Sequence, residues 1–143
     1  MVVNNQLRKE LWVQPPPLPL PEGDLARRLR GPRYDLEVVK QLATESNIKA
    51  MTLKSQDDLD DLEWDLEDVA TLFQSLSEDD YYASEWVQVS NRMVVDADAY
   101  VIEYDASCQR RRRMAQRYYV KFGFANNKVL LLLVSCHEER EKR

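Results

Sequence analysis

The sequence predicts an α+β fold in which amino-terminal helices pack on a small, mainly antiparallel sheet. Apolar residues recur at helical spacing between residues 35 and 76, and four strand-like runs follow between residues 81 and 137. Of the 143 residues, 44% are hydrophobic and 31% are charged, which suits one ordinary core and argues against a disordered chain. We therefore expect a single domain over residues 32–143.

The predicted helices lie in the first half of this domain. In "YDLEVVKQLATES", Leu36, Val39 and Leu42 form an apolar face at helical spacing. Asp35 precedes this face and can cap the helix. "NIKAMT" then alternates as a short strand, and a second helix over about residues 65–76 buries its apolar residues on one face.

An acidic segment lies around the start of the second helix. "DDLDDLEWDLED", at residues 57–68, has eight acidic residues in twelve. We interpret it as the starts of two helices, because carboxylates in a first turn are favoured by the helix dipole. The Asp-x-Asp-x-Asp-Gly pattern of a calcium-binding loop is absent, so we do not predict a metal site here.

Four predicted strands complete the chain: "YYASEWVQVS", "AYVIEYD", "RYYVKFGF" and "KVLLLLVSCH". Each is bounded by turn-like residues, and Asn126–Asn127 predicts a hairpin turn between the last two. The turn between the second and third is longer, at roughly a dozen residues, than a plain hairpin needs.

Residues 1–31 are predicted to form a proline-rich extension or flexible arm. Five of the six prolines lie in "PPPLPLP", at residues 15–21, which favours polyproline II. We interpret the segment as a spacer, and recognition by an aromatic groove is the alternative. "LARRLR", at residues 25–30, either joins an RNA-binding surface or is a solvated basic patch.

Composition excludes several classes of protein. No run of 18 apolar residues is present and the amino terminus lacks the apolar region of a signal peptide, so we predict a cytoplasmic protein with no membrane partner. Cys108, Cys136 and His137 do not have the spacing of a zinc site. We expect free thiols, no metal and no other cofactor.

The net charge of −5 is divided unevenly along the chain. Residues 1–100 carry 10 basic and 20 acidic side chains, whereas residues 101–143 carry 10 basic and 5 acidic ones. The second part attracts a polyanion, and the first part suits a basic partner protein. The second part also contains four consecutive arginines, which we favour as a phosphate-binding loop over a solvated hairpin tip. They are Arg110, Arg111, Arg112 and Arg113.

Three stretches resemble the MqsR-type toxins of bacterial toxin–antitoxin modules, which are small RelE-like mRNA interferases. They are "DLEDVATLFQSLSEDDYYAS", "YVKFGFANNKVLLLLVS" and "YDLEVVKQLA". The resemblance covers about residues 32–137. It implies a RelE-like fold and a sequence-specific ribonuclease that cuts mRNA without a cofactor. It also implies a cognate antitoxin protein that holds the enzyme inactive.

The family's functional residues transfer only in part. The family's lysine after the aromatic-Tyr corner falls on Ala83, the methionine that follows falls on Glu85, and a glutamine falls on Ala97. The tyrosine of the penultimate strand is retained as Tyr119, and the lysine that ends the last strand corresponds to His137. Of the four positions that carry a polar functional residue in the family, two have therefore lost their polar group, at Ala83 and Ala97.

Strand alternation gathers other polar residues. RNA cleavage without a metal needs a base for the 2′-hydroxyl, cations for the phosphate charge and an acid for the leaving oxygen. In "RYYVKFGF", Arg117, Tyr119 and Lys121 alternate with an apolar face, and Glu103 and His137 are expected to share their side of the sheet. We predict His137 as the acid and Glu103 or Tyr119 as the base or phosphate orienter. Arg117, Lys121 and the arginine loop are predicted to bind RNA phosphates.

Plainer interpretations compete with each of these roles. His137 could be a solvated strand end, and Tyr119 an ordinary half-buried strand residue. Glu103 could pair with Arg117 or Lys121 across the sheet.

Two other functions remain open. The replacement of polar residues by Ala83 and Ala97 favours a catalytically degenerate module that binds RNA or protein. An interaction protein that uses the proline-rich arm is a third interpretation.

Overall fold

A computed structural model describes residues 7–9, 16–125 and 129–139. Its architecture is the predicted α+β class: helices pack on a mainly antiparallel sheet with the strand order β1-β3-β4-β6-β7-β2, and β5 pairs with β4 outside this path. The helices are α2 (Asp24–Arg27), α3 (Leu36–Leu42), α4 (Leu53–Leu62) and α5 (Leu66–Ser75), with 3-10 turns η1 (Glu45–Asn47) and η2 (Glu78–Asp80). The strands are β1 (Arg28–Leu29), β2 (Ile48–Ala50), β3 (Tyr81–Ser90), β4 (Met93–Asp105), β5 (Arg110–Arg111), β6 (Arg117–Phe124) and β7 (Leu131–Glu138).

The helix starts confirm the predicted cap at Asp35 and correct a second prediction. Asp35 caps α3 and Asp65 caps α5, each through its side chain. The interpretation of residues 57–61 as a helix start is wrong, because α4 begins at Leu53 and these residues lie in its middle and last turns. The physical reason is a capping box at Thr52, which satisfies the first backbone donors of α4 one turn earlier.

The strands follow the predicted segments closely except at β4. This strand begins at Met93 rather than at the predicted Ala99. Asp96 and Asp98 made the early part of β4 look like a loop, yet both side chains are fully buried. The predicted turn at Asn126–Asn127 lies outside the described residues.

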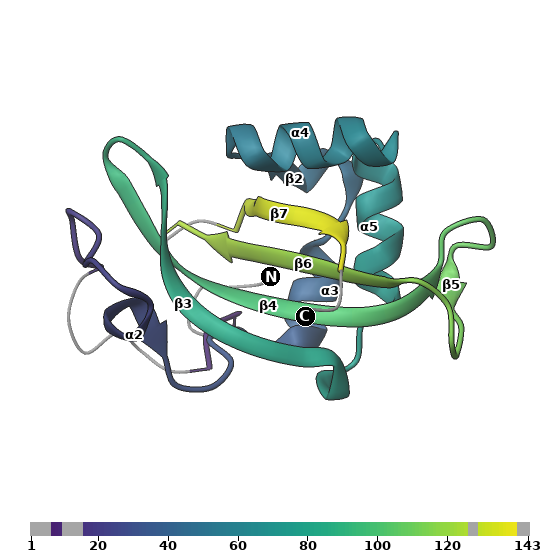
Figure 1. Cartoon of the computed structure of the whole chain (residues 1–143), viewed down its shortest axis with the longest axis horizontal. Helices are drawn as coiled ribbons and strands as arrows, with labels where there is room; N and C mark the ends of the chain where they lie inside the picture. The colour runs from purple at the N-terminus through teal and green to yellow at the C-terminus, as the bar shows by residue number, and fades with distance from the viewer. Residues whose placement is uncertain (1–6, 10–15, 126–128, 140–143) are drawn as a thin grey trace.

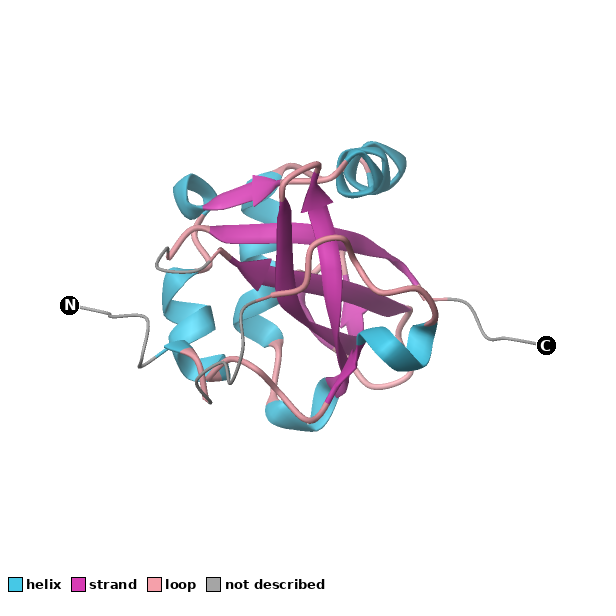
Figure 2. Ribbon diagram, turned by 90° about the vertical axis from the view of Figure 1, so that its left-hand side faces the viewer, coloured by secondary structure: helices cyan, strands magenta, loops and turns pink. Residues whose placement is uncertain are grey.

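Helices α3, α4 and α5 contribute to one buried cluster on one face of the sheet. In Figure 1, α3 and α5 lie behind the strands, and Figure 2 shows that the sheet is strongly twisted. Helix residues such as Val39, Leu72 and Phe73 share one buried cluster with the apolar side of β6. That side consists of Tyr118, Val120, Phe122 and Phe124, as predicted from alternation. We call the opposite side of the sheet the open face.

Strand β7 is held along its outer edge by two elements. Strand β2 pairs with it in parallel at residues 131–133. Beyond that point, Thr52 Oγ1 donates to the carbonyl of Val134 at 2.9 Å, and Asp58 Oδ2 accepts from the backbone N–H of Cys136 at 2.9 Å. These hydrogen bonds give backbone groups on the outer edge of β7 a partner, and they hold the end of the strand that carries His137.

Parts of the first 31 residues pack against the sheet and its core. Leu7 is fully buried in the helix-side cluster, and β1 pairs with β3 at the edge of the sheet. The division into a 1–31 arm and a 32–143 domain stays a prediction, and these contacts show where its two parts meet.

Two buried carboxylates of β4 hold the incoming chain. Asp96 accepts hydrogen bonds from the Tyr34 hydroxyl at 2.7 Å and from Arg8 at 3.2 Å. Asp98 accepts from the backbone N–H groups of Arg33 and Tyr34, at 2.9 and 3.1 Å. Because carboxylates without such partners are costly to bury, these contacts fix the path of the segment before α3.

Candidate functional site

The strand register brings the five predicted active-site residues to the open face. Tyr119 pairs with His137 on one side, and Glu103 pairs with Arg117 on the other. Directly paired residues of antiparallel strands point to the same side of a sheet, and Lys121 follows Tyr119 by two residues. The five residues therefore share a surface, while the roles assigned to them remain predictions.

Three rings form a row on this face. The ring of Tyr119 stacks on that of His137, with centroids 5.1 Å apart and an interplanar angle of 19°. Tyr82 meets Tyr119 edge-on at 6.0 Å, and its side chain is 61% exposed. Tyr82 was not predicted on this face, because alternation from Ser84 places it on the helix side. A bulge between Tyr81 and Ala83 reverses that alternation.

An ion pair lies beside the row. Lys121 Nζ is 2.6 Å from Glu85 Oε2, and 6.0 Å from the centroid of the Tyr119 ring. Glu85 belongs to β3 and Lys121 to β6, so their side chains meet above the intervening strand β4. The residues that pair with them there are Ala97 and Ala99, whose small side chains leave room for the contact.

The protonation of Lys121 and Tyr119 follows from their shared environment. Burial alone would lower the pKa of the Lys121 ammonium, but Tyr119 and Glu85 outweigh it, so that pKa is raised. Burial raises the pKa of the Tyr119 phenol, and the charge of Lys121 offsets only part of that effect. Lys121 is thus a cation and Tyr119 a neutral hydrogen-bond donor near neutral pH, which suits Tyr119 better to orienting a phosphate than to acting as a base.

Glu103 forms neither of the alternative ion pairs. Arg117 Nε lies 3.3 Å from Glu139 Oε1, and Lys121 is bound to Glu85. Within the part of the chain that the structure describes, the half-buried side chain of Glu103 forms no hydrogen bond or ion pair. His137 is half-buried, and its Nδ1 lies 2.9 Å from the carbonyl oxygen of Glu138.

The arginine run begins as strand β5, which pairs with the end of β4. The guanidinium of Arg111 donates to both carboxylate oxygens of Asp80 and to the carbonyl of Ser75 at 3.0 Å. Arg111 therefore ties the loop to the end of α5 and to η2.

The other three arginines are exposed. Arg112 forms an ion pair with Asp105 at 2.9 Å, and the Ser107 hydroxyl together with Arg112 lowers the pKa of the Asp105 carboxyl. Among the described residues, the side chains of Arg110 and Arg113 form no hydrogen bond or ion pair. Arg110 pairs with Asp105 and therefore points to the side of the sheet that carries Glu103.

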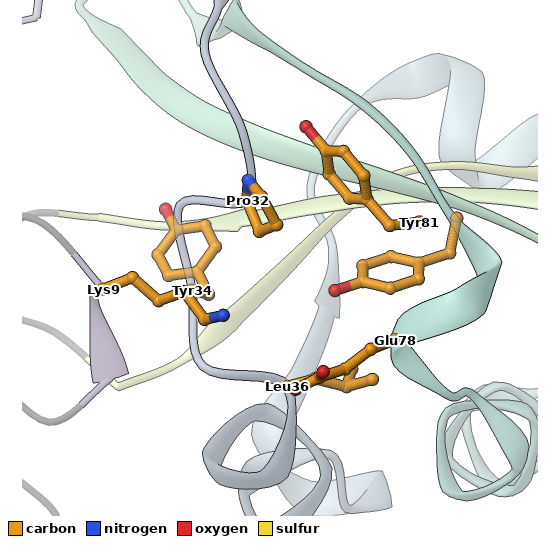
Figure 3. Close-up of a pocket in the computed structure, with 7 residues that line it drawn as sticks. Lys9, Pro32, Tyr34, Leu36, Glu78 and Tyr81 are labelled. Carbon is orange, nitrogen blue, oxygen red and sulfur yellow. The ribbon is translucent and has the colours of Figure 1, made fainter.

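A cavity of about 210 Å³ lies away from this surface, on the helix side of the sheet. Figure 3 shows Tyr34 and Tyr81 on either side of it. None of the predicted active-site residues lines it. The lining residues are Lys9, Pro32, Tyr34, Leu36, Glu78, Tyr81 and Tyr100.

Within residues 7–9, 16–125 and 129–139, no group of three or more His, Cys, Asp or Glu side chains is arranged to hold a metal ion. In the same residues, no helix is long and apolar enough to cross a membrane.

Residues 31–138 match the model of a protein family described as "Motility quorum-sensing regulator, toxin of MqsA". The chain belongs to this MqsR toxin family. Membership confirms the resemblance predicted from the sequence and makes the chain a toxin of a toxin–antitoxin module, with a cognate antitoxin as its partner. No curated protein and no solved structure matches the chain.

The two alanines that the resemblance predicts at functional positions of the family can be located in the fold. Ala83 and Ala97 lie on the open face with Tyr119 and His137, as the pairing of Ala83 with Ala99 and of Ala97 with Gly123 shows. The two alanines thus belong to the same surface as the ring row. Glu85, which forms the ion pair with Lys121, is the residue of β3 that pairs with Ala97.

Proposed function

We propose that the open face cleaves single-stranded mRNA without a metal, so that the toxin is a cytoplasmic endoribonuclease. The observation that carries this proposal is the row of Tyr82, Tyr119 and His137 rings beside the Lys121 cation. Unpaired RNA bases stack on aromatic side chains, and cations hold the phosphates between them. A stacking surface, a cation and a proton-transferring imidazole are therefore adjacent on one face.

The proposed chemistry assigns each group a step. The 2′-oxygen attacks the adjacent phosphorus as its proton passes to a base, and the bond from phosphorus to the 5′-oxygen breaks. His137, as imidazolium, protonates that 5′-oxygen, because imidazole exchanges protons readily near neutral pH. Lys121 and Arg117 offset the charge on the phosphate oxygens, and the Tyr119 phenol donates a hydrogen bond to one of them.

The experiment that tests the proposal compares cleavage of a mixed single-stranded RNA by the wild type and by His137→Ala, with EDTA present. We expect cleavage by the variant to fall at least ~100-fold, the usual effect of losing a general acid. Glu138→Ala is the matched control, since Glu138 is the exposed next residue of the same strand and points to the other face. Equal cleavage by wild type and His137→Ala would remove His137 from the mechanism.

A degenerate binding module is the second candidate function. It is favoured by Ala83 and Ala97, which lack the polar groups of the family, and by Glu85, which neutralises Lys121. In this case the wild type binds RNA in a salt-sensitive manner and leaves it intact.

A further inference from the structure

We propose that Glu85 is the general base of this site and takes the proton of the RNA 2′-hydroxyl. The inference rests on the proposed endoribonuclease function and assigns it a catalytic residue that differs from both Glu103 and Tyr119. It follows from the position of the Glu85 carboxylate, which lies on the open face in contact with Lys121.

The carboxylate is held in place and remains accessible. Its Oε2 accepts from Lys121 Nζ at 2.6 Å, whereas its Oε1 accepts no hydrogen bond from any described residue. The side chain is 34% exposed, against 16% for that of Lys121. One oxygen is therefore anchored to a cation, and the other is available to a hydroxyl group arriving from solvent.

The cation beside the base is also placed to bind the reacting phosphate. Lys121 Nζ donates to Glu85 and lies 6.0 Å from the centroid of the Tyr119 ring in the ring row. On the outer side, Arg28 of β1 pairs with Glu85 and faces the same way. Positive charges from β6 and β1 thus flank Glu85, and they draw a phosphate towards the base.

The ring row connects the Glu85–Lys121 pair to His137. Lys121 Nζ, which touches the Glu85 carboxylate, lies 6.0 Å from the centroid of the Tyr119 ring. That ring stacks on the imidazole of His137, with centroids 5.1 Å apart. We place the reacting phosphate at Lys121, so that Glu85 and His137 act on oxygens on opposite sides of phosphorus.

The other two candidates are placed less well. Glu103 is in contact with neither Lys121 nor His137, and it pairs with Arg117 nearer the end of the sheet. Tyr119 holds its proton near neutral pH because burial raises the pKa of its phenol. Glu85 alone combines a carboxylate with direct contact to the phosphate-binding cation.

The step balances as follows. Glu85 accepts the 2′-hydroxyl proton while the bond between the 2′-oxygen and phosphorus forms. The bond between phosphorus and the 5′-oxygen breaks, and the His137 imidazolium gives its proton to that oxygen. Glu85 is left protonated and His137 neutral, and proton exchange with water restores both groups.

The first test is the substitution Glu85→Gln, which keeps the shape of the side chain and an oxygen that can accept from Lys121. We expect a fall in kcat of at least ~100-fold, with partial recovery in Glu85→Asp. The acidic limb of the pH–rate profile, which reports protonation of the base, is expected to disappear in Glu85→Gln. Glu138→Gln, at an exposed glutamate of β7 that points to the helix side, is the matched control and is expected to keep both the rate and the limb.

The second test separates base from acid by changing the substrate. In an RNA whose scissile 5′-oxygen is replaced by sulfur, the leaving thiolate needs no proton. His137→Ala is expected to recover most of its lost rate on this substrate, whereas Glu85→Gln is not. Binding of a 2′-deoxy version of the RNA is expected to be equal in Glu85→Gln and the wild type, which shows that the variant is folded.

Several results would overturn the proposal. If Glu85→Gln cuts ordinary RNA as fast as the wild type or faster, Glu85 only competes with the phosphate for Lys121. Recovery of Glu85→Gln on the sulfur-containing RNA would make Glu85 the acid rather than the base. Both of these leave the ribonuclease proposal standing, while intact RNA after incubation with the wild type removes both proposals together.

Discussion

At the scale of single residues, Asp98 is a buried carboxyl whose pKa differs from that of an exposed one. Burial raises its pKa from 3.8 to about 6, although hydrogen bonds from Ser84 and from the backbone of Arg33 and Tyr34 act in the opposite direction. The Asp98 side chain joins β4 to the segment before α3. Its pKa is higher in the folded chain than in the unfolded chain.

This pKa predicts how stability changes with pH. The folded chain keeps the Asp98 proton up to about pH 6, whereas the unfolded chain releases it near pH 3.8. Between these values the native state binds more protons, so the Asp98 contribution to the free energy of unfolding is largest at low pH and declines as pH rises. The decline is about 3 kcal/mol in total, at roughly 1.4 kcal/mol per pH unit.

Urea unfolding between pH 3.5 and 7 measures the effect. The difference in free energy of unfolding between the wild type and Asp98→Asn is expected to shrink across this range, because Asn cannot titrate. Other carboxyls, such as Asp105, contribute equally to both proteins and cancel in the difference. Parallel curves for the two proteins would mean that Asp98 has an ordinary pKa.

At the scale of elements, the arginine loop divides into an anchored part and an exposed part. Arg111 and Arg112 are bound to Asp80 and Asp105, so their charges are partly neutralised within the fold. Arg110 and Arg113 are exposed and form no such pair among the described residues. The charge that the loop can offer to RNA therefore comes mainly from these two residues.

We predict that replacing Arg110 and Arg113 together by Ala lowers the salt dependence of RNA binding. Each lost phosphate contact to a single strand reduces the slope of log K against log salt by about 0.7, so the double variant is expected to lose roughly 1.4. Binding titrations at several salt concentrations give the slope. Arg92→Ala, an exposed arginine in the β3–β4 turn, is the control. An unchanged slope in the double variant would mean that Arg110 and Arg113 do not contact RNA phosphates.

The elements also show what could be predicted from the sequence. Alternation within β6 predicted both of its faces, because a period of two is a local property of one strand. The ring contact of Tyr82 depends on a bulge, and the Glu85–Lys121 pair depends on the register of three strands. The cap at Asp35 could be predicted for the same local reason. Asp96 was not predicted to lie in a buried strand, because its partners, Arg8 and Tyr34, are far away in the chain.

At the scale of the whole molecule, the core joins the helices, the sheet and a residue from the amino-terminal segment. Leu7 is fully buried in the same cluster as residues of α3, α5 and β6. Helices α3 and α5 lie on one face of the sheet (Figure 1), and the polar row lies on the other. That other face also carries a second buried cluster, to which Val87, Val95 and Leu132 belong, so the proposed chemistry lies beside a smaller core.

This arrangement predicts that Leu7→Ala destabilises the whole chain. Loss of a buried leucine side chain costs about 2–5 kcal/mol, because it removes apolar burial and leaves a cavity. Leu25→Ala is the control from the same segment, since Leu25 is 83% exposed and surface changes are usually within about 0.5 kcal/mol. Urea unfolding of both variants measures the difference. Equal stability of Leu7→Ala and the wild type would show that the segment is a separate arm.

The chemistry of the RNA ends tests the central claim most directly. Purified toxin is incubated with single-stranded RNA in EDTA, and the termini of the products are identified by mass spectrometry. Attack by the 2′-oxygen on the open face predicts discrete cuts that leave 2′,3′-cyclic phosphates and 5′-hydroxyls. Products with 3′-hydroxyls and 5′-phosphates, or RNA that stays intact, would contradict the account.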